Sequence, residues 1–164
     1  MICTIEPTQD FEQITSILTD NEMWPRISED GQNKDEFIVS ENAGFLWFGV
    51  FAEDGEMVGV FFFHYLNLST FQAHIHILEK HRKDYAKCSI IGMLEYFVHK
   101  ISHRVNKIVL EIPVIYPDVY HFTKKYGFYD EGVNKDSIYK GGKFVDQYRL
   151  GITKGEAETW LQQQ

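Results

Sequence analysis

The fold of this chain is decided by the stretch Gln72–Val98, which reads QAHIHILEKHRKDYAKCSIIGMLEYFV. Its first residues alternate between apolar and polar side chains, a pattern typical of a half-buried strand. A short basic segment, Lys80-His81-Arg82-Lys83, follows. Apolar residues then recur at helical spacing, at Cys88, Ile91, Leu94, Val98 and Ile101. We therefore predict a strand, a basic loop and a long helix from Tyr85 to His103, a geometry that binds phosphate at the helix start.

Three antiparallel strands are predicted before this loop. The aromatic-rich runs Phe45–Ala52 and Met57–Leu66 flank an Asp-Gly turn, which is a strong local signal for a β-hairpin. The third strand is Phe71–Leu78. The elements expected before the hairpin are a short strand at Ile2–Ile5, a helix at Phe11–Leu18 with Asp10 as its N-cap, and a second helix at Asp35–Glu41.

Further strands and a short helix are predicted after the long helix. They are a strand at Lys107–Pro113, a helix at Pro117–Tyr126 that ends at Gly127, and two closing strands at Phe128–Val133 and Phe144–Ile152. The resulting order is β-α-α-β-β-β-α-β-α-β-β. It predicts an α+β (α/β mixed) fold, with helices flanking a central mixed sheet. No repeat or linker interrupts the order, so we expect residues 1–164 to form a single domain.

The composition excludes several classes of function. The 164 residues carry a net charge of -8, which argues against nucleic-acid binding, because such binding depends on Lys and Arg that neutralise phosphates. No apolar run approaches the roughly 20 residues of a membrane span, and no signal-peptide pattern is seen at the start. Only Cys3 and Cys88 are present. A disulfide framework is therefore not expected, and the cytoplasm, a reducing compartment, is the default.

The order of elements and two motifs resemble the GNAT (Gcn5-related N-acetyltransferase) superfamily over nearly the whole chain. Members carry an Arg/Gln-x-x-Gly-x-Gly/Ala loop that cradles the acetyl-CoA pyrophosphate. Arg82 occupies its first position here, whereas Tyr85 and Lys87 replace the glycines. Gly127-Phe128 matches the end of the family's fourth helix. The tyrosine that serves many members as general acid falls on Thr123.

Within the superfamily, the chain is most similar to GNAT-like proteins of tailed bacteriophages. The segments that carry this narrower resemblance are Trp24-Pro25-Arg26-Ile27 with Glu29-Asp30-Gly31, His74-Ile75-His76, and Gly142-Lys143-Phe144-Val145-Asp146. The resemblance implies a protein of the host cytoplasm or one associated with the virion.

The resemblance to the superfamily implies acetyl-CoA as cosubstrate. By this analogy, Ile77 and Leu78 offer backbone groups to the pantetheine arm. The residues expected at the phosphates are Arg82, Lys83, Tyr85, Ala86 and Lys87. Basic side chains can grip phosphate directly. The alternative is an ordinary helix start, in which Asp84 is the N-cap and its carboxylate repels a pyrophosphate.

The polar face of the strand Phe71–Leu78 is expected to carry the general base. His74 and His76 are two residues apart, so their side chains face the same way, and His64 on the neighbouring strand lies near them. A histidine titrates near neutrality and can accept the proton of an amine. Glu79, beside the loop, is another candidate. The alternatives are structural histidines satisfied by hydrogen bonds, or a metal site built by His64, His74 and His76.

Tyr120 is the candidate acid for the leaving thiolate. It lies one helical turn before Thr123, so the two side chains share a helix face. Tyr120 can also be a packing residue, and the Thr123 hydroxyl can bond to its own helix backbone. The acceptor site is expected near Trp24, Tyr65 and the acidic turn Glu29-Asp30-Gly31, whose charge favours a cationic amine.

Two classes of function remain open from the sequence. The first is an N-acetyltransferase that moves an acetyl group from acetyl-CoA to an amine of a protein or small molecule. The second is a catalytically degenerate phage accessory or virion-associated protein that binds phage or host proteins. Arg82 and Gly127-Phe128 favour the first, and the missing glycines and tyrosine favour the second. Strand aromatics near the C-terminus would also allow a homodimer.

Overall fold

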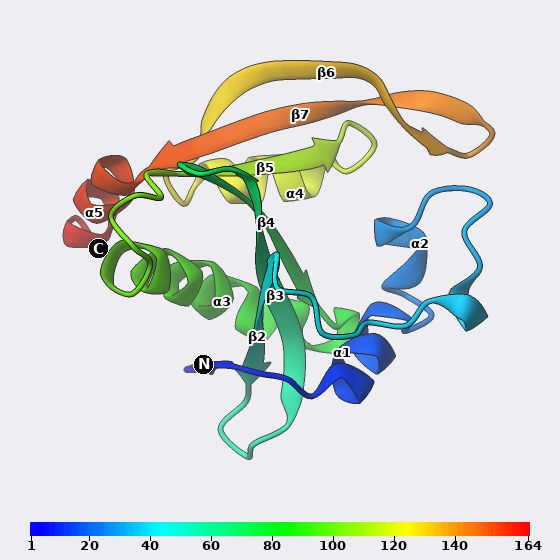
Figure 1. Ribbon diagram of the computed structural model, residues 1–164, viewed down its shortest axis with the longest axis horizontal. Coiled ribbons are helices and arrows are strands. Elements are labelled where there is room, and N and C mark those ends of the chain that lie inside the picture. The colour runs from blue at the N-terminus through cyan, green and yellow to red at the C-terminus, as the bar shows by residue number, and fades with distance from the viewer. The chain divides into compact units, whose positions relative to one another are not determined.

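The computed structural model describes every residue from Met1 to Gln164 (Figure 1). Hydrogen bonds order seven strands as β1-β2-β3-β4-β5-β7-β6. The strands are β1 (Thr4–Pro7), β2 (Phe45–Phe51), β3 (Met57–Asn67), β4 (Thr70–Ile77), β5 (Lys107–Pro113), β6 (Tyr129–Lys140) and β7 (Lys143–Thr153). The helices are α1 (Phe11–Leu18), α2 (Trp24–Ile27), α3 (Glu79–His99), α4 (Pro117–Lys124), α5 (Lys154–Gln162) and a 3-10 turn, η1 (Lys34–Glu36). Strands β4 and β5 are parallel and the pairs β2–β3 and β5–β7 are antiparallel, so the predicted mixed sheet is confirmed.

The chain divides into two compact units. The first contains Met1–His64 and His74–Met93, and the second contains Tyr65–Ala73 and Leu94–Gln164. Strands β3 and β4 and helix α3 contribute residues to both. None of the helices combines the length and the apolar character needed to cross a membrane.

Helix α1 forms where predicted and anchors the core of the first unit. The Asp10 carboxylate caps it by accepting a hydrogen bond from the Gln13 N–H (3.0 Å). The apolar residues of α1 recur on one face, and this face packs against β3. The buried residues of this cluster are Ile14, Ile17, Leu18, Val39, Met57 and Val60.

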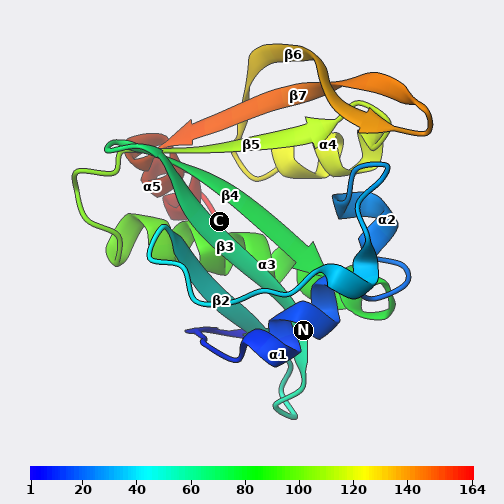
Figure 2. The same ribbon diagram turned by 45° about the vertical axis from the view of Figure 1, so that its right-hand side comes forward.

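The β2–β3 hairpin is also confirmed. Gly55 adopts a φ of +87°, and its N–H donates to the Ala52 carbonyl (3.0 Å). Glycine accepts this left-handed conformation at little cost, which is why the Asp-Gly pair is a dependable turn signal. Figure 2 shows β2 and β3 side by side.

The predicted basic loop is wrong, because α3 begins at Glu79, immediately after Leu78. The segment Lys80–Lys83 forms the first turns of the helix instead. Its Lys and Arg residues, like Glu79 before them, are good helix formers. The His81 N–H donates to the Leu78 carbonyl (2.9 Å) at the helix start. As a consequence, Asp84 lies inside the helix and is not its N-cap.

The helix predicted over Asp35–Glu41 is wrong as well. Only the turn η1 forms there, and the short helix α2 forms earlier in the chain, at Trp24–Ile27. Phe37 leaves η1 in an extended conformation, and the Val39 N–H donates to the Thr15 hydroxyl (2.9 Å). This bond to α1 is a tertiary contact, so a local sequence pattern could not reveal that the segment stays extended.

In the second unit, β5, β7 and β6 lie side by side, and α4 lies beside β5 (Figures 1 and 2). Strands β6 and β7 extend beyond their predicted ends to a turn at Gly141 and Gly142, which have φ values of +63° and +76°. Most of β6 is exposed. It therefore lacks the alternation of apolar and polar residues that would reveal its length.

Helix α5 is missing from the sequence-based prediction. Thr153 and Glu156 form a capping box at its start, which is a recognisable local signal. The Lys154 ammonium donates to the carbonyls of Ile101 (2.8 Å) and Ser102 (3.1 Å), just beyond the end of α3. These bonds attach the start of α5 to the segment that follows α3.

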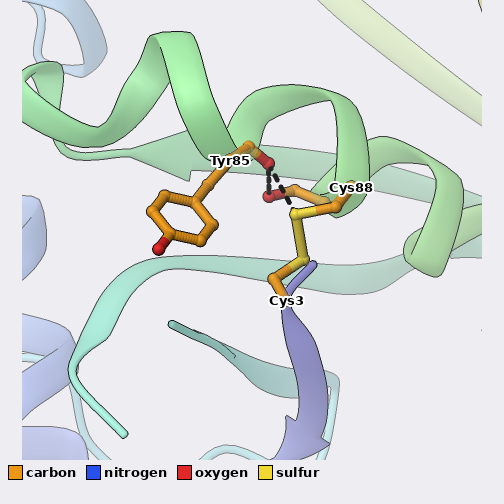
Figure 3. Close-up of a disulfide and its surroundings, with 4 residues drawn as sticks. Cys3, Tyr85 and Cys88 are labelled. Carbon is orange, nitrogen blue, oxygen red and sulfur yellow. Dashed lines mark hydrogen bonds between the residues drawn. A yellow bond between two sulfur atoms is a disulfide. The ribbon is translucent and has the colours of Figure 1, made fainter. Parts of the chain in front are cut away.

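The two cysteines form a disulfide, contrary to the expectation from the sequence. Cys3 precedes β1 and Cys88 lies in α3, and their Cα atoms are 6.0 Å apart although 85 residues separate them. Figure 3 shows the disulfide beside Tyr85. Tertiary structure brings the two residues together, so the number and spacing of the cysteines could not predict the bond.

Candidate functional site

Six rings share one face of β2, β3 and β4 in the first unit. All six side chains are half-buried. We call this set the histidine face, and it consists of Phe45, Trp47, Phe62, His64, His74 and His76. Residues two apart on a strand point the same way, and the register sets Trp47 opposite Phe62. The prediction that the three histidines lie together on one face is confirmed.

His74 lies at the centre of the histidine face. Its ring stacks on Phe62, with centroids 4.4 Å apart and planes inclined by 10°. Its Nε2 atom lies 3.3 Å from Nε2 of His64. One of these two nitrogens donates and the other accepts, so the pair fixes complementary tautomers on the two rings. The His76 ring follows at 6.2 Å from that of His74.

Burial makes His74 and His76 weak bases. Desolvation, followed by the proximity of His76 and His64, lowers the pKa of His74 from 6.5 to about 3. Desolvation lowers the pKa of His76 to about 4. Both rings are therefore neutral at pH 7. They can accept a hydrogen bond from an amine or a water molecule, but they do not retain a proton at that pH.

One polar group of the histidine face is buried without a hydrogen-bond partner within the protein. The Nε1 atom of Trp47 is buried without an acceptor. An unpaired buried donor costs roughly 1–3 kcal/mol, so such a group calls for a ligand or water partner. Sequence reasoning did not select Trp47, although its alternation with Phe45 in an aromatic strand was a usable signal.

The alternative of a metal site is not supported. No group of three or more His, Cys, Asp or Glu side chains is arranged to hold a metal ion. The facing nitrogens of His64 and His74 bond to each other instead.

The start of α3 gathers positive charge. Glu56, from the β2–β3 turn, pairs with Lys80 (3.0 Å) and His81 (3.3 Å). Arg82, Lys83 and Lys87 have no ion-pair partner. Cations near the positive end of a helix dipole destabilise that end, so this arrangement is unfavourable until an anion approaches. Glu79 is the one acidic residue of the first turn, and its side chain is exposed.

The backbone of α3 differs from the glycine-rich cradle of the family motif. Tyr85, Ala86 and Lys87 lie inside the helix, where backbone N–H groups bond to carbonyls four residues earlier. The Leu78 N–H donates to the Val58 carbonyl (3.0 Å), and the Leu78 carbonyl accepts from His81. Side chains, together with the orphan amides of the first turn, are therefore what the start of α3 can offer to a phosphate.

Tyr120 belongs to a hydrogen-bonded group in the second unit. Its hydroxyl donates to the Asp130 carboxylate (2.8 Å) and accepts from Lys124 (3.3 Å), and Lys124 also pairs with Asp130. The Tyr120 ring packs on Tyr148, with centroids 4.3 Å apart. The Thr123 hydroxyl donates to the Val119 carbonyl (2.8 Å), as one of the alternatives predicted.

The aromatic residues expected at the acceptor site pack locally within their own units. In the first unit, Trp24 lies edge-on to Phe37 with centroids 5.1 Å apart. In the second unit, Tyr65 lies edge-on to Phe71 at 4.5 Å. The acidic turn is exposed, and Gly31 has a φ of +90°.

Comparison with known proteins identifies the fold. No family model and no curated protein matches the sequence. The structure of spermidine N-acetyltransferase from Vibrio cholerae in complex with CoA and spermine is similar, with a TM-score of 0.79 and 20% identity over 95% of this chain and 98% of that chain. A chimera of that enzyme, SpeG, has a TM-score of 0.81 and 19% identity over 96% of this chain and 99% of that chain. The protein therefore has the GNAT fold.

Proposed function

We propose that this protein is an N-acetyltransferase that transfers an acetyl group from acetyl-CoA to an amine. The observation that carries the proposal is the similarity of fold, over 95% of the chain, to a spermidine N-acetyltransferase solved with CoA. A fold can host more than one function. The charge at the start of α3 and the chemistry of the histidine face supply the further support.

Arg82, Lys83 and Lys87 hold the CoA phosphates in this proposal. Arg82 lies in the first turn of α3, where an anion also relieves its unfavourable interaction with the helix dipole. Lys83 and Lys87 follow on the same helix, and none of the three has an ion-pair partner. Arginine can bind phosphate with two parallel hydrogen bonds. Tyr85 and Ala86 position these side chains through the helix that they build.

Ile77 presents its backbone to the pantetheine arm in this proposal. Leu78 was assigned the same role by analogy, but its N–H and carbonyl are both bonded within the protein. Leu78 is therefore the connecting residue between the end of β4 and the start of α3.

The acceptor is a cationic amine in this proposal. The net charge of -8 and the acidic turn at Glu29-Asp30 attract cations. The similar enzymes bear the name of spermidine N-acetyltransferase, which is consistent with this chemical class.

The histidine face orients the amine. An alkylammonium group has a pKa of about 10.4, so passing its proton to a ring of pKa about 4 would be uphill by about 9 kcal/mol. His74 and His76 therefore accept hydrogen bonds from the neutral amine, and the proton leaves to water past the exposed Glu79. This role follows from desolvation, which keeps both imidazoles neutral.

Tyr120 protonates the leaving thiolate. Its hydroxyl donates to Asp130 in the structure, and this O–H is the proton source that the proposal assigns to Tyr120. Lys124, at 3.3 Å from the phenolic oxygen, stabilises the phenolate that forms. These roles follow the general requirement of acyl transfer for a proton acceptor at the amine and a proton donor at the leaving group.

Isothermal titration with acetyl-CoA and CoA tests the proposal. Binding with a micromolar Kd is expected, followed by release of free CoA thiol when primary amines, polyamines among them, are added. Equal heats from titration of dephosphorylated pantetheine would contradict phosphate recognition at α3. Absence of binding at millimolar acetyl-CoA would overturn the proposal.

A second candidate is a GNAT-fold protein that acts by binding other proteins. The replacement of both loop glycines by Tyr85 and Lys87, and the continuous helix from Glu79, favour it. A phage origin finds no support in the similar structures. The titration separates the two candidates, because a protein-binding module does not require affinity for CoA.

A further inference from the structure

Strand β1 rests on helix α3 through two neighbouring contacts. The first is the disulfide between Cys3 and Cys88. The second is the Ile5 side chain, which lies so close to Gly92 that a Cβ atom at position 92 would collide with the Ile5 Cδ1. Residues two apart on a strand and four apart on a helix share a face. The bond and the apolar contact therefore form one continuous joint.

Apart from this joint, β1 is weakly held. It has only four residues, three of them exposed, and it lies at the edge of the sheet. Its register pairs Thr4 with Phe51 and Pro7 with Phe48 on β2. Short edge strands with few buried apolar contacts open at low free-energy cost. The covalent bond therefore carries an unusually large share of the attachment of β1.

Helix α3 is suited to both redox states of Cys88. The Sγ atom lies 3.2 Å from the Tyr85 carbonyl oxygen. A dashed line marks this contact in Figure 3. A thiol at Cys88 can share that oxygen as a weak donor with the Ser89 hydroxyl, which lies 2.7 Å from it. Cys3 and Cys88 are both half-buried, so a small thiol or disulfide can reach the bond.

We propose that Cys3–Cys88 is a reversible disulfide, and that its redox state controls whether β1 stays attached to α3. The oxidant is a low-molecular-weight disulfide of the glutathione class. One protein thiolate attacks it, forms a mixed disulfide and releases one small thiol. The second cysteine then displaces the second small thiol and closes the Cys3–Cys88 bond. Two electrons pass from the protein to the small disulfide, and the reverse sequence opens the bond.

Opening the bond changes the edge of the sheet. When β1 detaches, β2 becomes the edge strand, and its backbone groups lose partners. The Thr8 N–H donates to the Trp47 carbonyl (3.0 Å), so the loss extends to a residue of the histidine face. The redox state is thereby linked to the order of β2, whatever reaction the protein performs.

Hydrogen exchange on the full chain tests this inference. The oxidised protein, verified by mass, is compared with the protein reduced by dithiothreitol. We expect peptides covering residues 1–8 and 45–51 to exchange at least tenfold faster after reduction, while peptides from β5 and β7 keep their rates. Equal rates in both states for residues 1–8 would overturn the inference. So would acceleration throughout the chain, because it would mean global unfolding.

Cys3→Ser supplies a second measurement. Position 3 lies before β1, so this variant leaves α3 intact, and it should exchange like the reduced protein with or without dithiothreitol. If dithiothreitol changes the hydrogen-exchange rate of residues 45–51 in Cys3→Ser, the change cannot come from the disulfide. That result would contradict the role of the bond. Titration of the reduced protein with oxidised glutathione should close the bond, with two equivalents of thiol released. If both cysteines still react with an alkylating reagent after this titration, the bond has not closed. That result would also contradict the inference.

Discussion

The indole ring of Trp160 lies directly against Gly127. A Cβ atom at position 127 would come within 2.9 Å of the Trp160 Cδ1 and Cγ atoms. Gly127 also has a φ of +86°, which side chains disfavour. Backbone conformation and the packing of α5 thus both require glycine at position 127, the first residue of the Gly127-Phe128 motif.

Gly127→Ala is expected to lower the free energy of unfolding by about 2–3 kcal/mol, the sum of left-handed strain and overpacking against Trp160. Urea denaturation measures the change. Gly155→Ala is the matched control. Gly155 lies in α5, and a Cβ atom added there would meet nothing within 4 Å, so alanine should stabilise the protein by about 0.5 kcal/mol. Similar effects of the two substitutions would contradict the packing argument.

Arg82→Ala is expected to weaken CoA binding at least tenfold, because Arg82 carries a charge that no protein carboxylate neutralises. Lys80→Ala is the control on the same helix turn, where Glu56 already neutralises the lysine (3.0 Å). It should change affinity by no more than about threefold, in line with the small worth of exposed ion pairs. Titration calorimetry at two salt concentrations measures the CoA affinity of both variants. Equal losses would remove Arg82 from the phosphate site.

Acidification is expected to destabilise the protein between pH 6.5 and about pH 3. The unfolded chain binds protons on His74 and His76 near pH 6.5, whereas the folded protein binds them only near the lowered pKa values of about 3 and about 4. The unfolded state thus holds more protons in this window. Stability is complete above pH 6.5 and falls as the pH falls, by about 2 kcal/mol for each histidine at pH 5.

Urea denaturation at pH 7 and pH 5 measures this effect. His76→Gln should show a smaller difference between the two pH values than the unmodified protein. His121→Gln, at an exposed position, is the control and should keep the full difference. An unchanged difference in His76→Gln would mean that His76 titrates normally in the folded state.

Tyr120→Phe is expected to lower kcat at least tenfold and to leave KM for acetyl-CoA nearly unchanged, because it removes the proton donor and keeps the ring on Tyr148. Asp130→Asn separates this role from a structural one. It removes the carboxylate that holds the hydroxyl at rest, and we expect it to retain kcat within threefold. Steady-state assays of CoA release measure both variants. A similar loss of kcat in both variants would mean that Tyr120 and Asp130 have a structural role.

Local sequence patterns predicted the elements whose own residues carry the information. The strand Lys107–Pro113 and the helix Phe11–Leu18 have the predicted bounds, because their apolar periodicity and the Asp10 cap are local. The Asp-Gly turn of the β2–β3 hairpin follows from the freedom of Gly55. The start of α3 was misplaced, because good helix formers at Lys80–Lys83 resembled a loop only by their charge.

For the candidate site, the sequence alone determined which chemical groups are available. It identified three histidines on one face of two neighbouring strands, a basic cluster at the start of a long helix and the Gly127-Phe128 motif. Only the tertiary structure decided how these groups behave. Burial against Phe62 makes His74 a weak base, Glu56 neutralises Lys80 but leaves Arg82 unpaired, and the position of β1 joins Cys3 to Cys88. Desolvation, ion pairing and disulfide formation depend on neighbours distant in sequence, and a local pattern does not contain them.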